Sequence, residues 1–211
     1  MAYNEFTLDM LLRNFPLQME EVPDLFAEFA PISPSSLLQQ QLDAYLELAL
    51  EISTEKARSE FIIAPVLGEI RRYFQQRISL FSGVEFNVDH DRGLRGVCDF
   101  MLSLSPLQLV IQAPVIAVVE AKNENMKAGL GQCIAEMLAA QQFNRERHNP
   151  VPIVYGVVTT GSNWRFLSLQ AELVRVDRTE YHISDLPHIV GVLIGMIQSA
   201  VDSGTATASI A

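Results

Sequence analysis

Three ionisable residues interrupt two apolar stretches in the middle of the chain. Asp99 lies within "GVCDFMLSL" (96–104), and Glu120 and Lys122 close the run "PVIAVVEAK" (114–122). Both stretches have the composition of largely buried strands. Because side chains alternate across a strand, Glu120 and Lys122 face the same side. If the two strands are neighbours, we expect Asp99, Glu120 and Lys122 to converge near one end of a sheet.

This combination of side chains suggests a metal site. Two carboxylates in a poorly hydrated place repel each other, and each raises the pKa of the other. A divalent cation relieves that repulsion, and hard carboxylate oxygens suit Mg²⁺ or Mn²⁺. An ammonium beside the cation could orient or deprotonate a water molecule, or stabilise negative charge on a phosphate. The sequence therefore predicts a site for Mg²⁺ or Mn²⁺ at Asp99 and Glu120, with Lys122 beside it.

The surrounding pattern predicts an α/β domain. Apolar spacing indicates helices near 7–15, 35–52, 53–76 and 126–146, and a closing helix that begins at Asp185. Segments 83–89, 95–104, 114–122, 152–160 and 164–170 are predicted strands, the first two forming a hairpin, and a Pro-punctuated loop spans 16–34. From residue 54 the order is α-β-β-β-α-β-β-α, which indicates a mixed β-sheet flanked by helices.

Within the predicted helix at 53–76, two residues break the pattern. Pro65 predicts a kink or a helix restart. Glu60 lies three residues before Ile63 and seven before Leu67, which places an acid on the inward-facing stripe of a regular helix. Glu60 is therefore a candidate site residue, although an ion pair with Lys56 or Arg58 at the surface would also explain it.

The arrangement of Asp99, Glu120 and Lys122 after a helix with Glu60 resembles the PD-(D/E)xK nuclease superfamily, which has the restriction endonuclease-like fold. The resemblance covers about residues 54–170. Within this superfamily, the chain is most similar to the N-terminal nuclease domain of type I restriction enzyme motor subunits. In that domain a strand ending in Glu-Ala-Lys is followed by a helix that contains a glutamine and then by a "VTTG-x-x-W-x-F" hairpin. Here these parts are "VIAVVEAK", "GLGQCIAEMLAAQ" and "VTTGSNWRF".

The resemblance implies roles for individual residues. Asp99, Glu120 and the backbone carbonyl of Ala121 would bind the metal, and Lys122 would be the catalytic lysine. Glu60 would reach the metal through water, and Gln132 would help to place the lysine or the scissile phosphate, although an ordinary exposed helical glutamine is an equal alternative. The chain departs from the family pattern at two places: Cys98 stands where proline often precedes the aspartate, and Glu136 stands at the tyrosine position of the Gln-x-x-x-Tyr version.

Charge and domain organisation bear on the partners. The net charge is −10, but residues 1–53 hold nine acidic groups against Arg13 alone, which leaves a net of −2 for residues 54–211. We expect an acidic helical N-terminal extension (1–53), a nuclease-like domain (54–202) and a disordered tail (203–211). The acidity weakens a nucleic-acid interpretation without removing it.

Composition also bears on location. Cys98 and Cys133 both lie in apolar patterns, which favours buried reduced thiols and a cytoplasmic protein over a disulfide. The N-terminus has no basic region before an apolar stretch, so we expect no secretory signal. The longest apolar candidate, "HIVGVLIGMIQSA" (188–200), is too short to span a membrane.

These observations lead to two hypotheses. The first is a Mg²⁺-dependent nuclease that hydrolyses DNA phosphodiester bonds with low sequence specificity, RNA being an alternative substrate and a homodimer a further option. The second is a catalytically inactive nuclease fold that binds a protein or nucleic-acid partner, with the acidic N-terminal extension as a docking segment.

Overall fold

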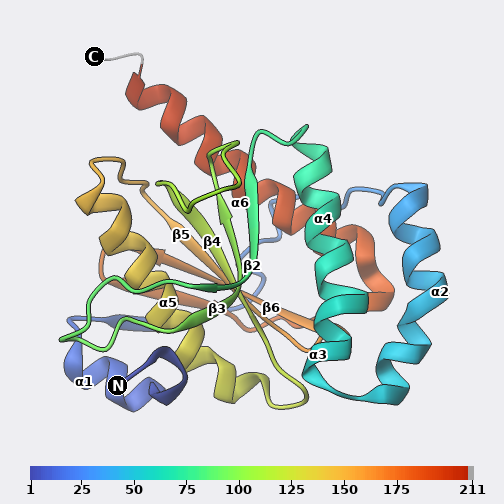
Figure 1. Cartoon of the computed structure of the whole chain (residues 1–211), viewed down its shortest axis with the longest axis horizontal. Coiled ribbons are helices and arrows are strands. Elements are labelled where there is room, and N and C mark those ends of the chain that lie inside the picture. Colours follow the sequence, from blue (N-terminus) through green and yellow to red (C-terminus); the bar gives the residue numbers. More distant parts are fainter. Residues whose placement is uncertain (209–211) are drawn as a thin grey trace.

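The computed structural model describes residues 1–208, with side chains up to residue 203, and contains one mixed β-sheet with helices on both faces (Figure 1). The strands are β1 (Gln18–Val22), β2 (Ser79–Glu85), β3 (Val97–Ser103), β4 (Val115–Ala121), β5 (Val154–Thr159), β6 (Asn163–Gln170), β7 (Leu173–Asp177) and β8 (Tyr181–His182). The α-helices are α1 (Leu8–Asn14), α2 (Ser36–Ile52), α3 (Glu55–Arg58), α4 (Ala64–Tyr73), α5 (Met126–Glu146) and α6 (Leu186–Ala208). The predicted α/β class is confirmed.

The strand order across the sheet is β1-β7-β6-β5-β4-β3-β2, and β8 pairs with β6. β4 and β5 are parallel and joined by α5, and β1 and β7 are parallel; the other pairs are antiparallel. The predicted hairpin is therefore present as β2 and β3. β4 is an interior strand between β5 and β3, and all seven of its residues are buried, which explains why its sequence is apolar on both faces.

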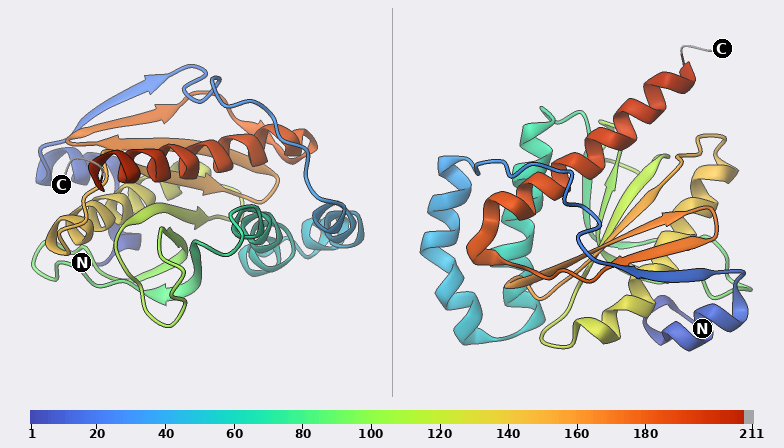
Figure 2. Two further views of the ribbon diagram at one scale, coloured as in Figure 1. Left: turned by 90° about the horizontal axis from the view of Figure 1, so that it is seen from above. Right: turned by 180° about the vertical axis from the view of Figure 1, so that it is seen from behind.

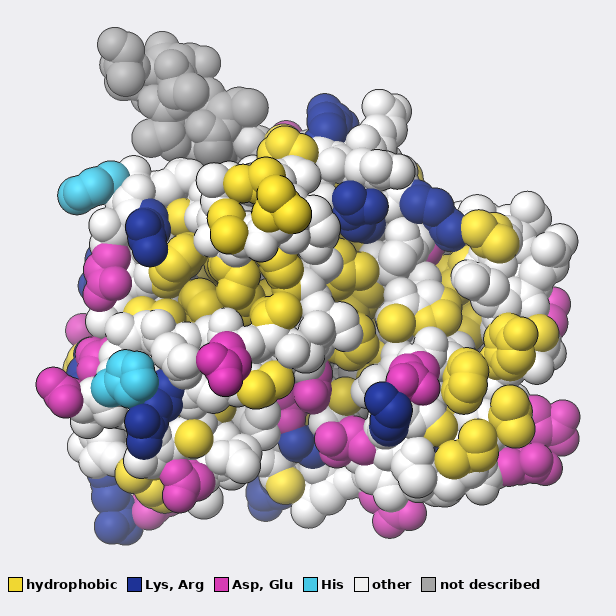
Figure 3. All heavy atoms as spheres, in the orientation of Figure 1, with side chains coloured by type: hydrophobic (Ala, Val, Ile, Leu, Met, Phe, Trp, Pro, Cys, Tyr) yellow, Lys and Arg dark blue, Asp and Glu magenta, His cyan; other side chains and the backbone are white. Residues whose placement is uncertain are grey.

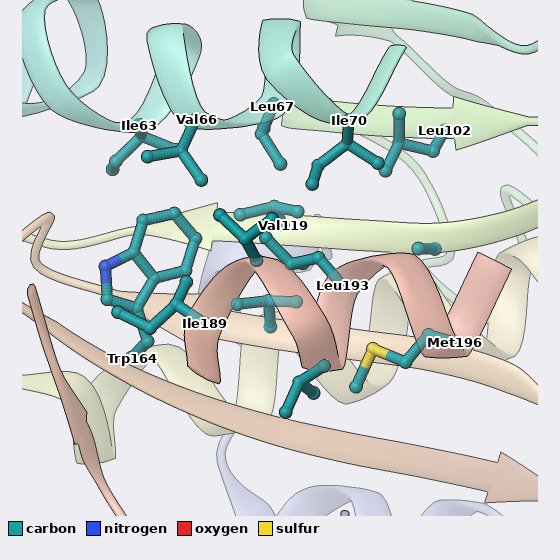
Figure 4. Packing of buried hydrophobic residues seen from close by; sticks show 14 of the residues in the cluster. Ile63, Val66, Leu67, Ile70, Leu102, Val119, Trp164, Ile189, Leu193 and Met196 are labelled. Carbon is teal, nitrogen blue, oxygen red and sulfur yellow. The ribbon is translucent and has the colours of Figure 1, made fainter. Parts of the chain in front are cut away.

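Two hydrophobic cores cover the two faces of the sheet. On one face, α4 and α6 pack over the sheet through Val66, Leu67 and Ile70 from one side and Leu193 and Met196 from the other (Figure 4). On the opposite face, α5 and α1 pack over the sheet, as the views in Figure 2 show. The 21-residue α5 begins at the N-cap Asn125, whose side chain accepts a hydrogen bond from the N–H of Ala128.

The N-terminal residues are built into this sheet. β1 pairs with β7 at the sheet edge, and Tyr3, Phe6 and Leu11 are buried in the core under α5. The segment 16–34, expected to be a loop, thus contains a strand. Its sequence "QMEEV" gave no strand signal because β1 is short, half-exposed and rich in acid, as edge strands often are. Residues 1–53 therefore contribute a strand and core side chains to the same fold as residues 54–202.

The helix expected over 53–76 is interrupted where the proline predicted a restart. α3 and α4 are joined by a π-helical turn, Ser59–Ile63, and Pro65 lies in the first turn of α4. A π turn holds an extra residue and rotates the side chains that precede it relative to those that follow. Spacing based on a regular α-helix therefore misplaces Glu60, which is exposed rather than on the buried stripe. That part of the expectation was wrong.

Other boundaries also differ from expectation. The first strand of the hairpin is Ser79–Glu85, four residues earlier than predicted, and β7 and β8 were not predicted. α6 extends to Ala208, so residues 203–208 of the expected disordered tail are helical, while residues 209–211 lie outside the described residues. By length and composition, Ile183–Ser203 could cross a membrane, contrary to our expectation of too short a run; however, 61% of this stretch is buried. A helix that covers a core passes the same test.

Candidate functional site

Asp99 and Glu120 are cross-strand neighbours. β3 and β4 are antiparallel with Phe100 opposite Val119, and the next pair in this register is Asp99 and Glu120. Opposite residues project to the same face of a sheet. Here it is the face covered by α5, because Met101 and Val118, one pair further along on that face, belong to the α5-side core. The N–H of Ala121 donates a hydrogen bond of 2.8 Å to Oδ2 of Asp99, which fixes the orientation of that carboxylate.

Glu120 is fully buried, which is unusual for a carboxylate. Burial and repulsion by Asp99 raise its pKa to about 8, although the ammonium of Lys122 opposes the shift. Oε1 forms an ion pair with Nζ of Lys122. Beyond this ammonium, neither carboxylate oxygen has a hydrogen-bond donor among the described residues. A buried oxygen in this condition is a ready ligand for a cation.

Lys122 lies between the carboxylates and α5. Its side chain is 22% exposed, and Nζ lies 3.4 Å from Oε1 of Gln132. Burial lowers the pKa of Lys122, but the charge of Glu120 outweighs this effect, so the pKa is raised overall. Lys122 is thus a charged ammonium with one face toward Glu120 and another toward Gln132. The structure brings Asp99, Glu120, Lys122 and Gln132 together, and Gln132 is buried rather than an exposed helical residue.

Glu136 is a member of this cluster that the sequence analysis noted only as a departure from a motif. Nε2 of Gln132 donates a hydrogen bond of 3.1 Å to Oε1 of Glu136, one helical turn further along α5. Glu136 is fully buried, and its Oε2 has no partner among the described residues. Burial and the charge of Glu120 raise the pKa of Glu136 well above its usual value. An acid four residues after Gln132 on an apolar helix was the available signal.

Glu60 does not join the cluster directly. It is exposed and forms an ion pair of 2.9 Å with Lys56, one turn earlier on the same helix. The acid of this helix whose charge reaches the cluster is Glu55: it raises the pKa of both Glu120 and Lys122. The sequence analysis missed Glu55, because the α-helical spacing that singled out Glu60 does not hold across the π turn.

Most of the buried polar side-chain atoms that lack a hydrogen-bond partner lie in or near the cluster of Asp99, Glu120, Lys122, Gln132 and Glu136. Among the described residues, eight buried side-chain nitrogen or oxygen atoms have no hydrogen-bond partner, although one of them, Oε1 of Glu120, is ion-paired with Lys122. Six of them lie in the cluster or in the loops and strands beside it: Arg58 Nε, Glu120 Oε1 and Oε2, Asn123 Oδ1, Glu136 Oε2 and Arg165 Nε. Native proteins leave few such atoms unsatisfied, so their concentration in one place points to a binding site for polar or charged ligands.

The cluster offers some, but not all, of the ligands that a magnesium ion needs. No group of three or more His, Cys, Asp or Glu side chains in the described part of the chain could hold a metal. However, Mg²⁺ usually takes only one or two carboxylates from the protein and completes its shell with water and substrate phosphates. Asp99 and Glu120, with an unpartnered oxygen on Glu120, meet that requirement. The carbonyl of Ala121 as a further ligand stays a prediction.

An open pocket of about 520 Å³ adjoins the cluster. It is lined by the β4–α5 loop that begins directly after Lys122, by the β5–β6 turn and by Arg58 of α3. The backbone N–H of Lys122 donates to the carbonyl of Thr159, the residue that precedes this turn, so the lysine and the pocket wall share one framework. Figure 1 shows the β4–α5 connection emerging below α3.

No known protein family matches this chain, and no curated protein sequence is similar to it. What the chain does must therefore be inferred from its own residues and geometry.

Proposed function

We propose that the chain is a metal-dependent nuclease of the PD-(D/E)xK type, with a restriction endonuclease-like fold, that hydrolyses DNA phosphodiester bonds with low sequence specificity. One observation carries the proposal. Asp99, Glu120 and Lys122, from adjoining strands, meet on one face of the sheet, and Glu120 is a buried carboxylate with an unpartnered oxygen. Such a group is costly to the fold, which is typical of residues retained for function.

Each residue has a distinct part in this proposal. Asp99 and Glu120 would hold Mg²⁺ or Mn²⁺, which when bound would polarise the phosphate and activate water. Neutralising the charge of Glu120 weakens its hold on the ammonium of Lys122. Lys122, which also donates a hydrogen bond to Gln132, can then turn toward the phosphate and stabilise the negative charge that develops there. Glu60 would act at most through water, since it lies at the surface.

Substrate and location are parts of the same proposal. DNA is the proposed substrate, and RNA offers the same phosphodiester group, so both belong in the assay. The two free cysteines, Cys98 and Cys133, are buried, and burial raises the pKa of both thiols. Buried, unreactive thiols support the proposed cytoplasmic location. A homodimer is proposed only because many nucleases cut two strands as pairs.

A second candidate function is a nuclease fold that has lost activity and binds a partner. Two observations favour it. Glu120 and Lys122 already neutralise each other, and no third His, Cys, Asp or Glu side chain completes a metal-binding group in the described part of the chain. In addition, α2 exposes large hydrophobic side chains (Leu37, Tyr45, Leu48, Leu50 and Ile52) near its acids, visible at the α2 edge in Figure 3.

The two functions are separated by incubating plasmid DNA, and separately a labelled RNA, with purified protein and Mn²⁺. We expect wild type to cleave DNA, and Lys122→Ala and Asp99→Asn each to lose about 100-fold or more of that rate. Asp99→Asn is the matched substitution, because an amide oxygen can still accept the Ala121 hydrogen bond while the charge is gone. Mn²⁺ should also raise the melting temperature of wild type but not of Asp99→Asn. Equal cleavage by all three proteins would refute the nuclease proposal, and no cleavage by any would favour the binding module.

A further inference from the structure

The pocket beside the cluster is built from four segments that are far apart in the sequence. Arg58 comes from α3, and the stretch Asn123–Lys127 from the β4–α5 loop and the start of α5. The β5–β6 turn and the start of β6 contribute Thr160, Ser162, Asn163 and Arg165, and Glu180 comes from the segment before β8. Its lining includes Arg58, Lys127 and Arg165. The whole sequence contains three lysines, Lys56, Lys122 and Lys127. Lys56 lies on α3, Lys122 directly after β4 and Lys127 at the start of α5.

Arg58 is the most informative residue of this pocket. It is only 9% exposed. Its Nη1 donates to the carbonyl of Thr160 at 2.8 Å and to Oγ of Ser162 at 3.4 Å, which holds the guanidinium against the β5–β6 turn. Its buried Nε has no hydrogen-bond partner among the described residues, and no described carboxylate lies within ion-pairing distance of the guanidinium. Burying a cation without an anion beside it is costly, so the guanidinium of Arg58 is suited to bind an anionic ligand.

The start of α5 supplies the second set of donors. The side chain of Asn125 satisfies the N–H of Ala128, which leaves the N–H groups of Met126 and Lys127 at the helix start without a partner from the cap. The first turn of this 21-residue helix contains no acid and has Lys127 instead, opposite to what the helix dipole favours. Lys127 is exposed and has no carboxylate within ion-pairing distance in the described part of the chain. An anion at this place would offset both features.

The acids of the pocket do not cancel these charges. Glu180 is paired with Arg165, so the two neutralise each other. Glu124 is the remaining acid of the lining, against Arg58 and Lys127. The lining thus has a formal charge of +1 in a chain whose net charge is −10. A guanidinium fork, an ammonium, the Ser162 hydroxyl and helix N–H groups are the donors that phosphate oxygens accept.

We propose that the pocket formed by Arg58, the N-terminus of α5 and the β5–β6 turn binds a phosphate group, and that this group is a backbone phosphate of the substrate strand next to the one that is cleaved. Phosphate binding follows from the pocket itself. The assignment to a nucleic-acid strand rests on the proposed nuclease function, because the loop that lines the pocket begins directly after Lys122.

The test measures binding rather than cleavage. A short labelled oligonucleotide, single-stranded and duplex, is titrated with the full chain in EDTA over a range of salt concentrations, and inorganic phosphate is added separately in a thermal-shift assay. Lys127→Gln should weaken oligonucleotide binding by about 3- to 10-fold and lower the slope of log Kd against log salt by about 0.7 for single strands and 0.9 for duplex. Arg58→Gln should weaken it at least as much.

The matched control is Arg145→Gln, which removes one positive charge at the other end of α5 and should leave binding within about twofold of wild type. Arg58→Gln also removes the hydrogen bond to Thr160, so its melting temperature is measured alongside. If that variant unfolds, the exposed Lys127 still allows the proposal to be tested.

Equal oligonucleotide binding by wild type and Lys127→Gln would refute the proposal that this pocket binds a phosphate. Equal losses of binding in Lys127→Gln and Arg145→Gln would refute it as well. Stabilisation by inorganic phosphate without oligonucleotide binding would support the phosphate site and overturn its assignment to a strand. Charge-dependent binding without cleavage would refute the nuclease proposal alone.

Discussion

Gly129 of α5 lies directly against the side chain of Lys122. A β-carbon at Gly129 would stand 3.0 Å from Cγ of Lys122 and 2.8 Å from Cγ1 of Val158. The second distance is shorter than real contacts of a β-carbon, so a side chain at this position would force Val158, Lys122 or α5 itself to shift. The absence of a side chain at this position is what lets α5 hold Lys122 between Glu120 and Gln132.

Gly129→Ala is therefore expected to displace Lys122. We expect it to lower the cleavage rate by about 10- to 100-fold, because small shifts of a catalytic group have large effects, and to destabilise the fold by about 1–3 kcal/mol. The rate is measured in the plasmid assay and the free energy of unfolding in urea.

Gly68→Ala on α4 is the matched control. A β-carbon at Gly68 would meet nothing within 4 Å. Replacing a helical glycine by alanine in open space should stabilise the protein by roughly 0.5–1 kcal/mol and leave cleavage unchanged. A Gly129→Ala variant as active as Gly68→Ala would show that the close approach of α5 does not position the lysine.

The sequence was sufficient for the long elements. The boundaries of α5 matched the prediction, because an N-cap asparagine and a long apolar pattern define it, and β3 and β4 were predicted from their largely apolar sequences. β1 was missed because its parallel pairing with β7 joins residues far apart in the chain, and no local pattern encodes such a contact; β7 forms an antiparallel hairpin with β6, and the local signal in its alternating sequence "LVRVD" was overlooked. Local periodicity thus predicted β2 to β6 but not β7 or the edge strand β1.

The candidate site was predicted in part for a similar reason. Alternation along β4 was enough to place Glu120 and Lys122 on one face, and the order of the strands made Asp99 their neighbour. Glu60 was misplaced because a π turn changes the helical period, which a sequence of good helix formers does not reveal. The link from Gln132 to Glu136 depends on side-chain packing in the core, so only coordinates could show it.

Glu55 and Glu60 can be distinguished by substitution. Because the charge of Glu55 raises the pKa of Glu120 and Lys122, Glu55→Gln should shift the pH profile of cleavage to lower pH. It should also change the rate at neutral pH by roughly 5-fold, the effect of about 1 kcal/mol in the barrier. Glu60→Gln removes only an exposed ion pair with Lys56, so we expect an unchanged pH profile and a change in stability below about 1 kcal/mol.

The pH profiles of the two variants are recorded side by side with that of wild type. A shifted profile in Glu60→Gln, together with a normal one in Glu55→Gln, would restore Glu60 as the auxiliary acid that the family resemblance implies. Unshifted profiles in both would mean that neither acid of this helix acts on the cluster.

Glu136 gives a prediction about the pH dependence of stability. A carboxyl whose pKa is raised in the folded protein stabilises the fold fully below its unfolded pKa, near 4.5, and this contribution is lost as the pH rises toward the folded pKa. Glu136→Gln cannot ionise and keeps a partner for Gln132. We therefore expect wild type and variant to be similar at pH 4, and the variant to gain by up to about 1.4 kcal/mol for each pH unit above 4.5.

The difference in unfolding free energy between Glu136→Gln and wild type, from urea titrations at several pH values, checks this prediction. Other carboxylates titrate in both proteins and cancel in the difference. Parallel stability curves from pH 4 to pH 8 would contradict a neutral Glu136. In that case the buried carboxylate would be charged, and the amide of Gln132 together with Lys122 would have to supply its stabilisation.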